Sequence, residues 1–260
     1  MFVKDLFDLS NSHRARFTCG YTVPIYRAMH LNSAGGGEVL DWNAYSLGEA
    51  SSVDDLRRYC HYDEAIACLS NLVFAGSRVL VVGSSVPWLE CLLARGGAEE
   101  IMTVEYRPIR WEPRFTRTRW SACEFSEFCK RSASRDFDVL VSYSSIEHSG
   151  LGRYGDDIDP DGDLVTLAVA QRWLVPTARV LLALPVGADA ILFNRHRVYG
   201  KNRLSVLARL LAKPKIRVVP PSPEYSSQFV PDQWSLEYAF NARPQDARPV
   251  YDRQLLLEFS

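Results

Sequence analysis

Residues 78–106 read RVLVVGSSVPWLECLLARGGAEEIMTVEY, and this stretch decides the expected fold of the 260-residue chain. After Arg78 an apolar run continues to Val82, which is typical of a strand buried on both faces of a parallel sheet. A turn of small residues, Gly83-Ser84-Ser85, leads into a helix that Gly96-Gly97 bring to an end. The run Ile101 to Val104 predicts a second strand. The stretch therefore predicts a strand–helix–strand unit.

The same stretch carries polar groups of the kind that bind a nucleoside. Glu105 ends the second strand 22 positions after Gly83, and a spacing of about 20 is expected for a carboxylate that accepts ribose hydroxyls. The later glycines of the G-x-G-x-x-G fingerprint are absent, so the turn is a poor pyrophosphate cradle. The pattern favours S-adenosylmethionine over NAD as the ligand. The alternative is an ordinary strand–helix–strand crossover in which Glu105 stands at this position by chance and binds no ligand. The residues predicted to bind the cofactor are Gly83, Ser84, Ser85, Glu105, Tyr106 and Ser142.

Composition and charge bound the expected partners. The formal net charge is −1, so no overall field draws the chain to nucleic acid or to a membrane surface. The six cysteines have no C-x-x-C spacing, which argues against a zinc site and a redox pair. Charged residues interrupt the N-terminal run MFVKDLFDLS, and arginines and prolines interrupt Leu164 to Phe193, so neither a signal peptide nor a membrane span is predicted. We expect a cytoplasmic protein, and the oligomeric state stays open.

A second group of polar residues follows the predicted strand Asp136 to Ser142. The chain continues YSSIEHSGLGRYGD up to Asp156, and ligands of open α/β sheets bind outside the carboxyl ends of the strands. Histidine titrates near neutrality, so His148 is the predicted general base, and Glu147 and Asp156 are further predicted catalytic residues. The alternative is that Glu147 and His148 only brace a polar loop, with Asp156 or a metal carrying the proton.

The predicted acceptor site lies at the same edge of the sheet. A third buried strand runs from Arg179 to Pro185, and a polar, aromatic segment follows it. The residues predicted to bind the substrate are Arg153, Tyr154, Asn194 and Arg197. Residues 157–163 imitate the first half of a calcium loop, but the twelfth position is Ala168, which has no carboxylate. Asp163 is instead expected to cap a helix over residues 164–174, so no metal ligands are predicted, although these acids leave room for a divalent cation.

With these segments placed, the chain resembles class I S-adenosylmethionine-dependent methyltransferases. More narrowly, it resembles an uncharacterised methyltransferase-like domain-of-unknown-function family first noted in nematode proteins. The matching motifs are VVGSSVPWLE with TVEY, SSIEHSGLGRYGD with the later DGD, and LPVGADAILFNRHRVYG, which together cover roughly Val79 to Gly200. The resemblance implies the methyl donor and an α/β fold, a Rossmann-like three-layer sandwich. Its sheet should be mostly parallel and roughly seven-stranded, with the last strand antiparallel.

These expectations lead to a domain division and to three functional hypotheses. Residues 1–75 are expected to form an N-terminal helical extension that acts as a flap or packs on the sheet edge, and residues 76–260 the S-adenosylmethionine-dependent methyltransferase-like domain. The leading hypothesis is an O-methyltransferase acting on a sugar or glycan hydroxyl, because the Asp-Pro-Pro-Tyr signature of amino methylation is absent after Ser142. RNA methylation is an alternative suggested by the arginine-aromatic run over residues 107–120, although nucleic acid is an unlikely partner at this net charge. A non-catalytic cofactor-binding or scaffold protein is the third.

Overall fold

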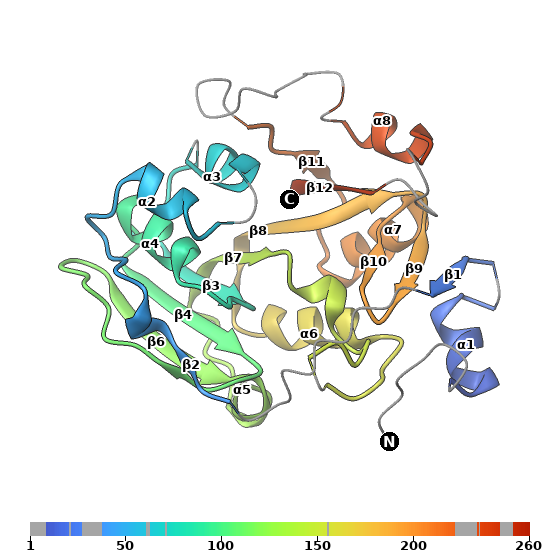
Figure 1. The fold of residues 1–260 in the computed structure, drawn as a ribbon, viewed down its shortest axis with the longest axis horizontal. Helices are drawn as coiled ribbons and strands as arrows, with labels where there is room; N and C mark the ends of the chain where they lie inside the picture. The colour runs from blue at the N-terminus through green and yellow to red at the C-terminus, as the bar shows by residue number, and fades with distance from the viewer. Residues whose placement is uncertain are drawn as a thin grey trace.

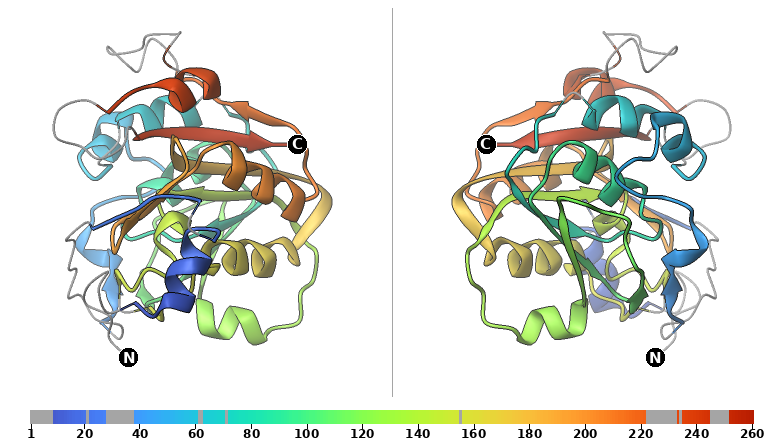
Figure 2. Two further views of the ribbon diagram at one scale, coloured as in Figure 1. Left: turned by 90° about the vertical axis from the view of Figure 1, so that its right-hand side faces the viewer. Right: turned by 90° about the vertical axis from the view of Figure 1, so that its left-hand side faces the viewer.

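The computed structural model describes residues 9–20, 22–27, 38–60, 63–70, 72–154, 156–221, 233, 235–244 and 252–260. A central twisted sheet runs through the molecule, with α3 (Asp63–Leu69) and α4 (Trp88–Arg95) on one side and α5 (Phe125–Lys130) and α6 (Gly162–Gln171) on the other (Figures 1 and 2). This is the three-layer α/β sandwich predicted from the sequence.

The central sheet has seven strands in the order β11-β12-β8-β7-β3-β4-β6. Every pair between β8 and β6 is parallel, whereas β12 runs antiparallel to both β8 and β11. The four strands predicted to be adjacent and parallel are neighbours, and the last strand is antiparallel, so both predictions are confirmed. The bounds are β3 (Arg78–Val82), β4 (Glu100–Glu105), β6 (Arg119–Glu124), β7 (Phe137–Tyr143), β8 (Leu174–Gly187), β11 (Ile216–Val218) and β12 (Asp252–Phe259).

The order of the strands defines where a ligand should bind. The chain leaves β3 for β4 and then β6, returns to the other side of β3 at β7, and continues outward to β8. The strand order therefore reverses between β3 and β7. In open α/β sheets the carboxyl ends of the strands at such a switch point border the ligand crevice. The turns after β3, β4 and β7 all reach this edge.

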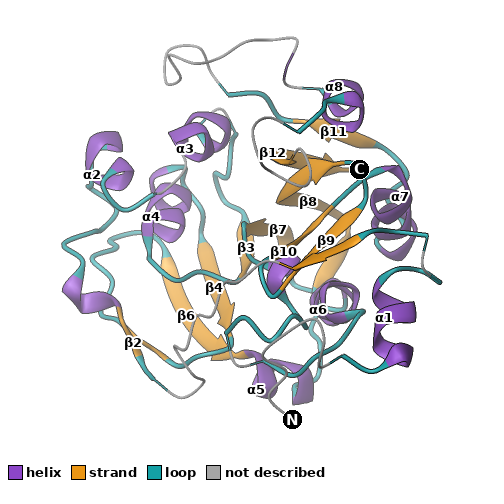
Figure 3. Cartoon of the chain, turned by 45° about the vertical axis from the view of Figure 1, so that its right-hand side comes forward, coloured by secondary structure: helices purple, strands orange, loops and turns teal. Residues whose placement is uncertain are grey.

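Two smaller sheets connect the first part of the chain to the rest. The strand β1 (Ile25–Arg27) pairs in parallel with β9 (Ala190–Phe193), which also pairs with β10 (His196–Val198). The strand β2 (Leu40–Asp41) pairs in parallel with β5 (Ile109–Arg110). Figure 3 shows β9 and β10 beside the end of β8. The segment before residue 76 thus contributes strands as well as helices, and the division of the chain at that point stays a prediction.

The helix α7 (Lys201–Leu210) is as long as α6 and contacts it. The other described helices are α1 (Asn11–Phe17), η2 (Trp42–Ala44), α2 (Val53–Arg57), η3 (Ile146–His148) and α8 (Leu236–Asn241). None of the helices in the described part of the chain has the length and apolar character needed to cross a membrane.

One helix differs from its prediction. The helix α6 begins at Gly162, and Asp161 occupies the N-cap position, so Asp163 lies inside the first turn and is not the cap. The carboxylate of Asp163 is fully buried and binds side chains from another part of the chain. A buried carboxylate needs charged or hydrogen-bonding partners, and those partners come from β10 and α7.

Candidate functional site

The turn after β3 and the end of β4 are joined through one carboxylate. Glu105 Oε2 accepts a hydrogen bond from the Ser84 backbone N–H at 2.9 Å, and Oε1 accepts one from the Tyr106 N–H at 2.8 Å. Burial raises the pKa of Glu105, and the hydrogen bonds from Tyr106 and Ser84 act against this rise. The structure thus brings together Ser84, Glu105 and Tyr106, which the sequence placed in one cofactor site.

Gly83 is held in a conformation that requires glycine. Its φ is +76°, and a Cβ built on it would lie 1.7 Å from Ser145 Oγ. Ser145 belongs to the loop after β7, so the two loops at the switch point touch here. The space that the missing side chain leaves is occupied by a side chain of this protein. Gly83 therefore lets the loop after β7 approach the loop after β3.

Replacing Gly83 by alanine is expected to destabilise the fold. The left-handed backbone alone costs a non-glycine residue roughly 1–2 kcal/mol, and the clash with Ser145 adds to this. Gly76→Ala is the matched control, because Gly76 has a φ of +70° and nothing within 4 Å of the added Cβ. Chemical denaturation should show a larger loss for Gly83→Ala, partly restored by Ser145→Gly in the same chain. Equal losses for the two single variants would contradict the proposed contact.

Two other predicted cofactor residues have structural partners. The Ser142 hydroxyl is buried and donates to the carbonyl oxygen of Val82 at 2.8 Å, which ties β7 to β3. The carbonyl oxygen of Ser85 accepts a hydrogen bond from Trp42 Nε1 at 3.1 Å. The position of Ser142 favours a role in holding the strands over direct contact with a cofactor. The side chain of Ser85 is exposed at the edge where the cofactor is expected.

The sequence did not point to two further residues at this edge. Phe125 begins α5, and its ring packs against Tyr106 with 5.0 Å between the ring centroids. Glu124 ends β6 in register with Glu105 of β4. Both were missed because β6 was not predicted as a strand. Tyr106 as a residue is 43% exposed, so the aromatic pair offers a partly open apolar surface beside the two carboxylates.

Part of the arginine-aromatic run is packed or paired with carboxylates. Trp111 and Trp120 pack around Trp42, with ring centroids 5.3 and 6.0 Å from it. Arg110 forms an ion pair with Asp41. Arg119 lies 3.2 Å from carboxylate oxygens of both Glu99 and Glu100. The aromatic residues of the run thus belong largely to packing, which weakens the motive for an RNA-binding surface.

Glu147 is buried at the start of the loop after β7. Its Oε1 accepts a hydrogen bond from Ser144 Oγ at 2.9 Å, whereas Oε2 has no hydrogen-bond partner among the described residues. Burial raises the pKa of Glu147 to about 7. Gln254 of β12 acts on this carboxyl group, and its Nε2 also lacks a partner in the described part of the chain. The Gln254 amide therefore faces the Glu147 carboxyl group and lowers its pKa as a hydrogen-bond donor, although Glu147 Oε2 and Gln254 Nε2 do not meet in a well-formed hydrogen bond.

His148 is locked inside the same loop. Its Nδ1 lies 2.5 Å from the carbonyl oxygen of Arg195, and Nε2 lies 3.7 Å from Glu147 Oε1. The Arg153 guanidinium is 3.1 Å from Nδ1. Burial and the positive charge of Arg153 lower the pKa of His148 to about 3. The imidazole is thus neutral near pH 7.

Asp156 and its neighbours shape the rest of the loop. Asp156 Oδ2 accepts hydrogen bonds from the backbone N–H groups of Gly150 at 2.6 Å and Gly152 at 3.4 Å, and Oδ1 accepts one from Tyr154 at 3.2 Å. The Arg153 guanidinium lies 5.2 Å from the centre of the Tyr154 ring. These contacts favour loop bracing by Asp156. Arg153 and Tyr154 are half-buried and remain at the predicted acceptor edge.

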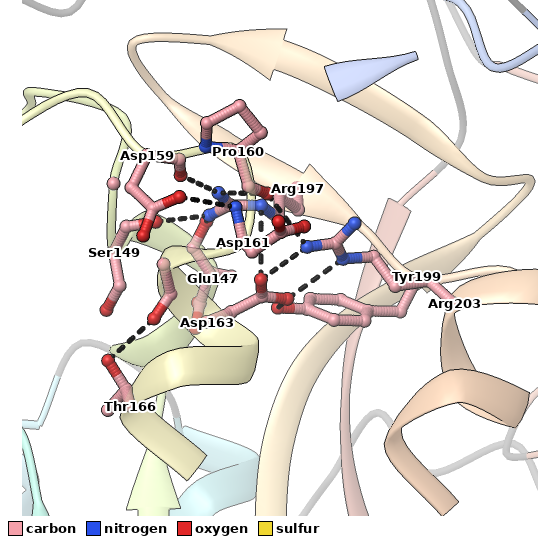
Figure 4. Close-up of polar contacts among 12 residues, drawn as sticks. Glu147, Ser149, Asp159, Pro160, Asp161, Asp163, Thr166, Arg197, Tyr199 and Arg203 are labelled. Carbon is pink, nitrogen blue, oxygen red and sulfur yellow. Dashed lines mark hydrogen bonds and ion pairs between the residues drawn. The ribbon is translucent and has the colours of Figure 1, made fainter. Parts of the chain in front are cut away.

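Arg197 lies at the centre of a buried polar network (Figure 4). Its Nη1 donates to the carbonyl oxygens of Ser149 at 2.5 Å and Glu147 at 3.3 Å. Asp163 lies 3.6 Å from Arg197 Nε, accepts a hydrogen bond from Tyr199 at 2.8 Å, and pairs with Arg203. Burial would raise the pKa of Asp163, but the two arginines outweigh it and lower the pKa.

This network gives Arg197 a structural role, and its predicted role in substrate binding stays a prediction. Its side chain is fully buried and binds backbone carbonyls, so its position favours holding the loop after β7 over binding a substrate. Asn194 is also buried, in the turn between β9 and β10, with a φ of +65°. No group of three or more potential metal ligands occurs among the described residues.

A family comparison agrees with the motifs. The model of the family described as "Caenorhabditis protein of unknown function, DUF268" matches residues 76–211, which is 136 of the 260 positions. The chain belongs to this family. The predicted resemblance is thereby confirmed, and all of the predicted catalytic and cofactor residues of the DUF268 chain fall within the matched range. No curated protein matches the chain.

Solved structures with a similar fold include three methyltransferases. A Burkholderia thailandensis 1,6-didemethyltoxoflavin-N1-methyltransferase, with bound S-adenosylhomocysteine, shares 15% identity over 76% of this chain and 79% of its own, with a TM-score of 0.44. Mitomycin 7-O-methyltransferase MmcR shares 14% identity over 76% of this chain and 53% of its own chain, with a TM-score of 0.43. Haemonchus contortus phosphoethanolamine N-methyltransferase 2 shares 13% identity over 76% of this chain and 52% of its own chain, with a TM-score of 0.45. The DUF268 chain thus aligns with about half the length of the last two.

Proposed function

We propose that this protein is an S-adenosylmethionine-dependent O-methyltransferase. One observation carries the proposal: the Glu105 carboxylate ends β4 and binds the Ser84 N–H of the turn after β3, at the point where the strand order reverses. A carboxylate in this place of a βαβ unit is the group that accepts ribose hydroxyls. The resemblance of the sequence motifs to class I methyltransferases supports the same cofactor.

The residues at this edge fit a nucleoside without a pyrophosphate. A carboxylate has about four lone-pair positions, and Glu105 uses one on each oxygen for a backbone N–H. One position on each oxygen is left for a ribose hydroxyl. The partly open pair of Tyr106 and Phe125 provides an apolar surface for the adenine ring. No second or third glycine is needed, because this cofactor has no phosphates to cradle.

When bound, S-adenosylmethionine supplies a methyl group on a positively charged sulfur. The residues of the chain then have to align an acceptor hydroxyl and take its proton. Of the three predicted catalytic side chains, Glu147 alone combines an unpaired oxygen with a pKa of about 7. We assign the proton to Glu147, and we assign His148 and Asp156 to the bracing of its loop. This reverses the roles expected from the sequence.

The proposed acceptor is a sugar or glycan hydroxyl. Glu147 Oε2 needs a donor and Gln254 Nε2 needs an acceptor, and one hydroxyl group satisfies both. Both atoms are buried, so only a hydroxyl that projects into the loop could reach them. Arg153 and Tyr154 on the same loop add a polar group over an aromatic face, which suits the mixed polar and apolar faces of a sugar ring.

A non-catalytic cofactor-binding protein is the second candidate. The observation in its favour is the Ser145 side chain that fills the space beside Gly83, because a tight contact there narrows the approach to the turn. Such a protein would bind the cofactor without transferring its methyl group. The binding and methyl-transfer experiment described next distinguishes the two candidates.

Calorimetric titration of the purified full chain with S-adenosylmethionine and with S-adenosylhomocysteine tests the proposal. We expect both to bind and NAD, the matched control, not to bind. Radiolabelled methyl donor is then incubated with the protein and separate pools of glycans, small polyols and RNA. Label in a hydroxyl acceptor supports the O-methyltransferase, and label in RNA supports the alternative. Binding without methyl transfer supports the non-catalytic protein. If neither ligand binds, the proposal that this chain binds S-adenosylmethionine is excluded.

A further inference from the structure

Glu90 is a fully buried carboxyl group beneath the turn after β3. It lies in the first turn of α4, and its side chain is 0% exposed. Oε1 accepts a hydrogen bond from Thr103 Oγ1 at 2.9 Å, and Oε2 accepts one from Ser84 Oγ at 3.1 Å. The sequence pattern assigned no role to this residue, and an acid on the apolar side of a helix calls for an explanation.

Ser84 connects two carboxyl groups. Its backbone N–H binds Glu105 and its hydroxyl binds Glu90, so the turn is fixed from both sides. Thr103 of β4 also accepts a hydrogen bond from Trp120 Nε1 of β6 at 3.2 Å, which extends the network across the sheet. In a dinucleotide fold the glycines set the shape of this turn. Here a side-chain network does so, with Glu90 at its centre.

Among the described residues no cation forms an ion pair with Glu90. Its two oxygens accept hydrogen bonds from the hydroxyl groups of Ser84 and Thr103, and its own backbone N–H also acts on the carboxyl group. Burial, together with the negative charge of Glu105, raises the pKa of Glu90 to about 7. The other titratable group that faces it is the Cys91 thiol, whose pKa is raised by burial and by Glu90. Glu90 therefore changes charge near neutrality while it holds the cofactor turn.

We propose that Glu90 positions the turn and, through its buried negative charge, favours S-adenosylmethionine over the demethylated product. The inference rests on the proposed function. S-adenosylmethionine carries a positive sulfur, and the product carries a neutral one. In a buried site an opposite charge favours the ionised form of a carboxyl group, so cofactor binding and the ionisation of Glu90 support each other. The product gains nothing from this charge and is released more readily.

The expected result is a preference for the cofactor that grows with pH. The ionised fraction of a carboxyl group with a pKa of about 7 rises on the order of tenfold between pH 6 and pH 8. The ratio of the product Kd to the cofactor Kd should increase by up to about that factor in the wild type. Glu90→Gln keeps the shape of the side chain and removes the charge, so its ratio should be lower at pH 8 and change less with pH. The ionisable groups of the two ligands are the same in experiments with the wild type and with Glu90→Gln. The difference between the two pH dependences of the Kd ratio therefore comes from Glu90.

Two further variants separate charge from position. Thr103→Val breaks the network and leaves the charge, so it should weaken both ligands by a similar factor. Glu147→Gln removes the other buried carboxyl group with a pKa of about 7, so the part of the pH dependence that this variant retains is assigned to Glu90. Glu147 thus provides the matched control for titration. Thermal melting confirms that each variant is folded before titration.

The outcomes decide the inference independently of the proposed function. Wild type and Glu90→Gln with the same ratio from pH 6 to pH 8 would overturn it. If Glu90→Gln does not fold, a constant wild-type ratio over this range overturns it, and a rising ratio that Glu147→Gln retains supports it. A wild type that binds neither ligand removes the proposed function itself. A wild type that binds both ligands equally at every pH removes only the role of Glu90.

Discussion

Replacing Glu105 by alanine is expected to weaken the binding of S-adenosylmethionine about a hundredfold or more. Hydrogen bonds to a charged group contribute about 1.5–3 kcal/mol each, and the carboxylate has room for two ribose hydroxyls. Their loss corresponds to a factor of roughly 10² or more in Kd. The Ser84 N–H and the Tyr106 N–H also lose their acceptor, so the turn becomes less well positioned for the nucleoside.

Calorimetry on the wild type and the variant measures this effect. Glu100→Gln is the matched control, because Glu100 begins the same strand at its opposite end and pairs with Arg78 at 3.0 Å, far along β4 from the turn. We expect the control to bind like the wild type. Equal affinities of the wild type and Glu105→Ala would remove Glu105 from the site. A parallel loss of binding in Glu100→Gln would point to a general loss of stability.

The central strands were predictable because their pattern depends on burial alone. β3 and β7 are covered on both faces, so nearly every residue in them is apolar and no other element fits such a run. Glu105 ends β4 as the sequence predicted, and its role in binding ribose stays a prediction. β6 was missed because it lies at the edge of the sheet. Its sequence, RWSACE, alternates between exposed and partly buried positions, and its arginine and tryptophan suggested a nucleic-acid surface.

The roles of the loop residues depend on contacts that sequence spacing does not reveal. Arg197 binds the backbone carbonyls of Glu147 and Ser149, which lie 50 and 48 positions earlier. Every residue has a backbone carbonyl, so the sequence does not show which carbonyls accept hydrogen bonds. A buried structural arginine therefore cannot be distinguished from a substrate-binding arginine by sequence alone. His148 is a similar case, because the carbonyl of Arg195 fixes its Nδ1. The sequence motif predicted the position of the loop. Only the three-dimensional structure shows which of its side chains already have hydrogen-bond partners within the protein.

The first part of the chain reaches the same edge as the predicted cofactor site. Trp42 is fully buried and donates a hydrogen bond to the Ser85 carbonyl in the turn after β3. Ser85, Ser84 and Glu90 are then successive members of one connected group that extends from η2 to β6. The flap predicted for residues 1–75 stays a prediction. The contact nevertheless explains how that segment would be coupled to the cofactor, because a shift of Trp42 acts on the turn directly.

Replacing Glu147 by glutamine is expected to lower methyl transfer by about 10²–10⁴, the usual contribution of a general base. A bound S-adenosylmethionine would supply the methyl group, and the electrons of the broken carbon–sulfur bond would stay on the leaving sulfide. Glu147 Oε2 would take the proton of the acceptor hydroxyl as the hydroxyl oxygen bonds to the methyl carbon. Glutamine cannot take the proton, but it fills the same volume. Affinity for S-adenosylmethionine should therefore stay within a fewfold of the wild type.

The pH profile distinguishes Glu147 from His148. A base with a pKa of about 7 acts in its ionised form, so the wild-type rate should rise from pH 6 to pH 8, and Glu147→Gln should remove the rise. His148 has a pKa of about 3 and is neutral over this range, so His148→Ala should lower the rate without changing the shape of the profile. Labelled methyl transfer to the acceptor found in the screen provides the measurement. A profile that loses its rise in His148→Ala and keeps it in Glu147→Gln would restore the histidine as the base.

Stability gives an independent check on the same carboxyl group. The pKa of Glu147 is raised on folding, from an ordinary value of 4.5 to about 7, so the folded state binds the proton more tightly than the unfolded state. Its contribution to stability is complete below about pH 4.5 and is lost as the pH rises through about 7. Urea denaturation of Glu147→Gln should therefore show a smaller loss of stability between pH 5 and pH 7 than the wild type. If the two curves stay parallel, Glu147 titrates as an ordinary acid and cannot hold the proton near neutrality, which also ends its assignment as the base.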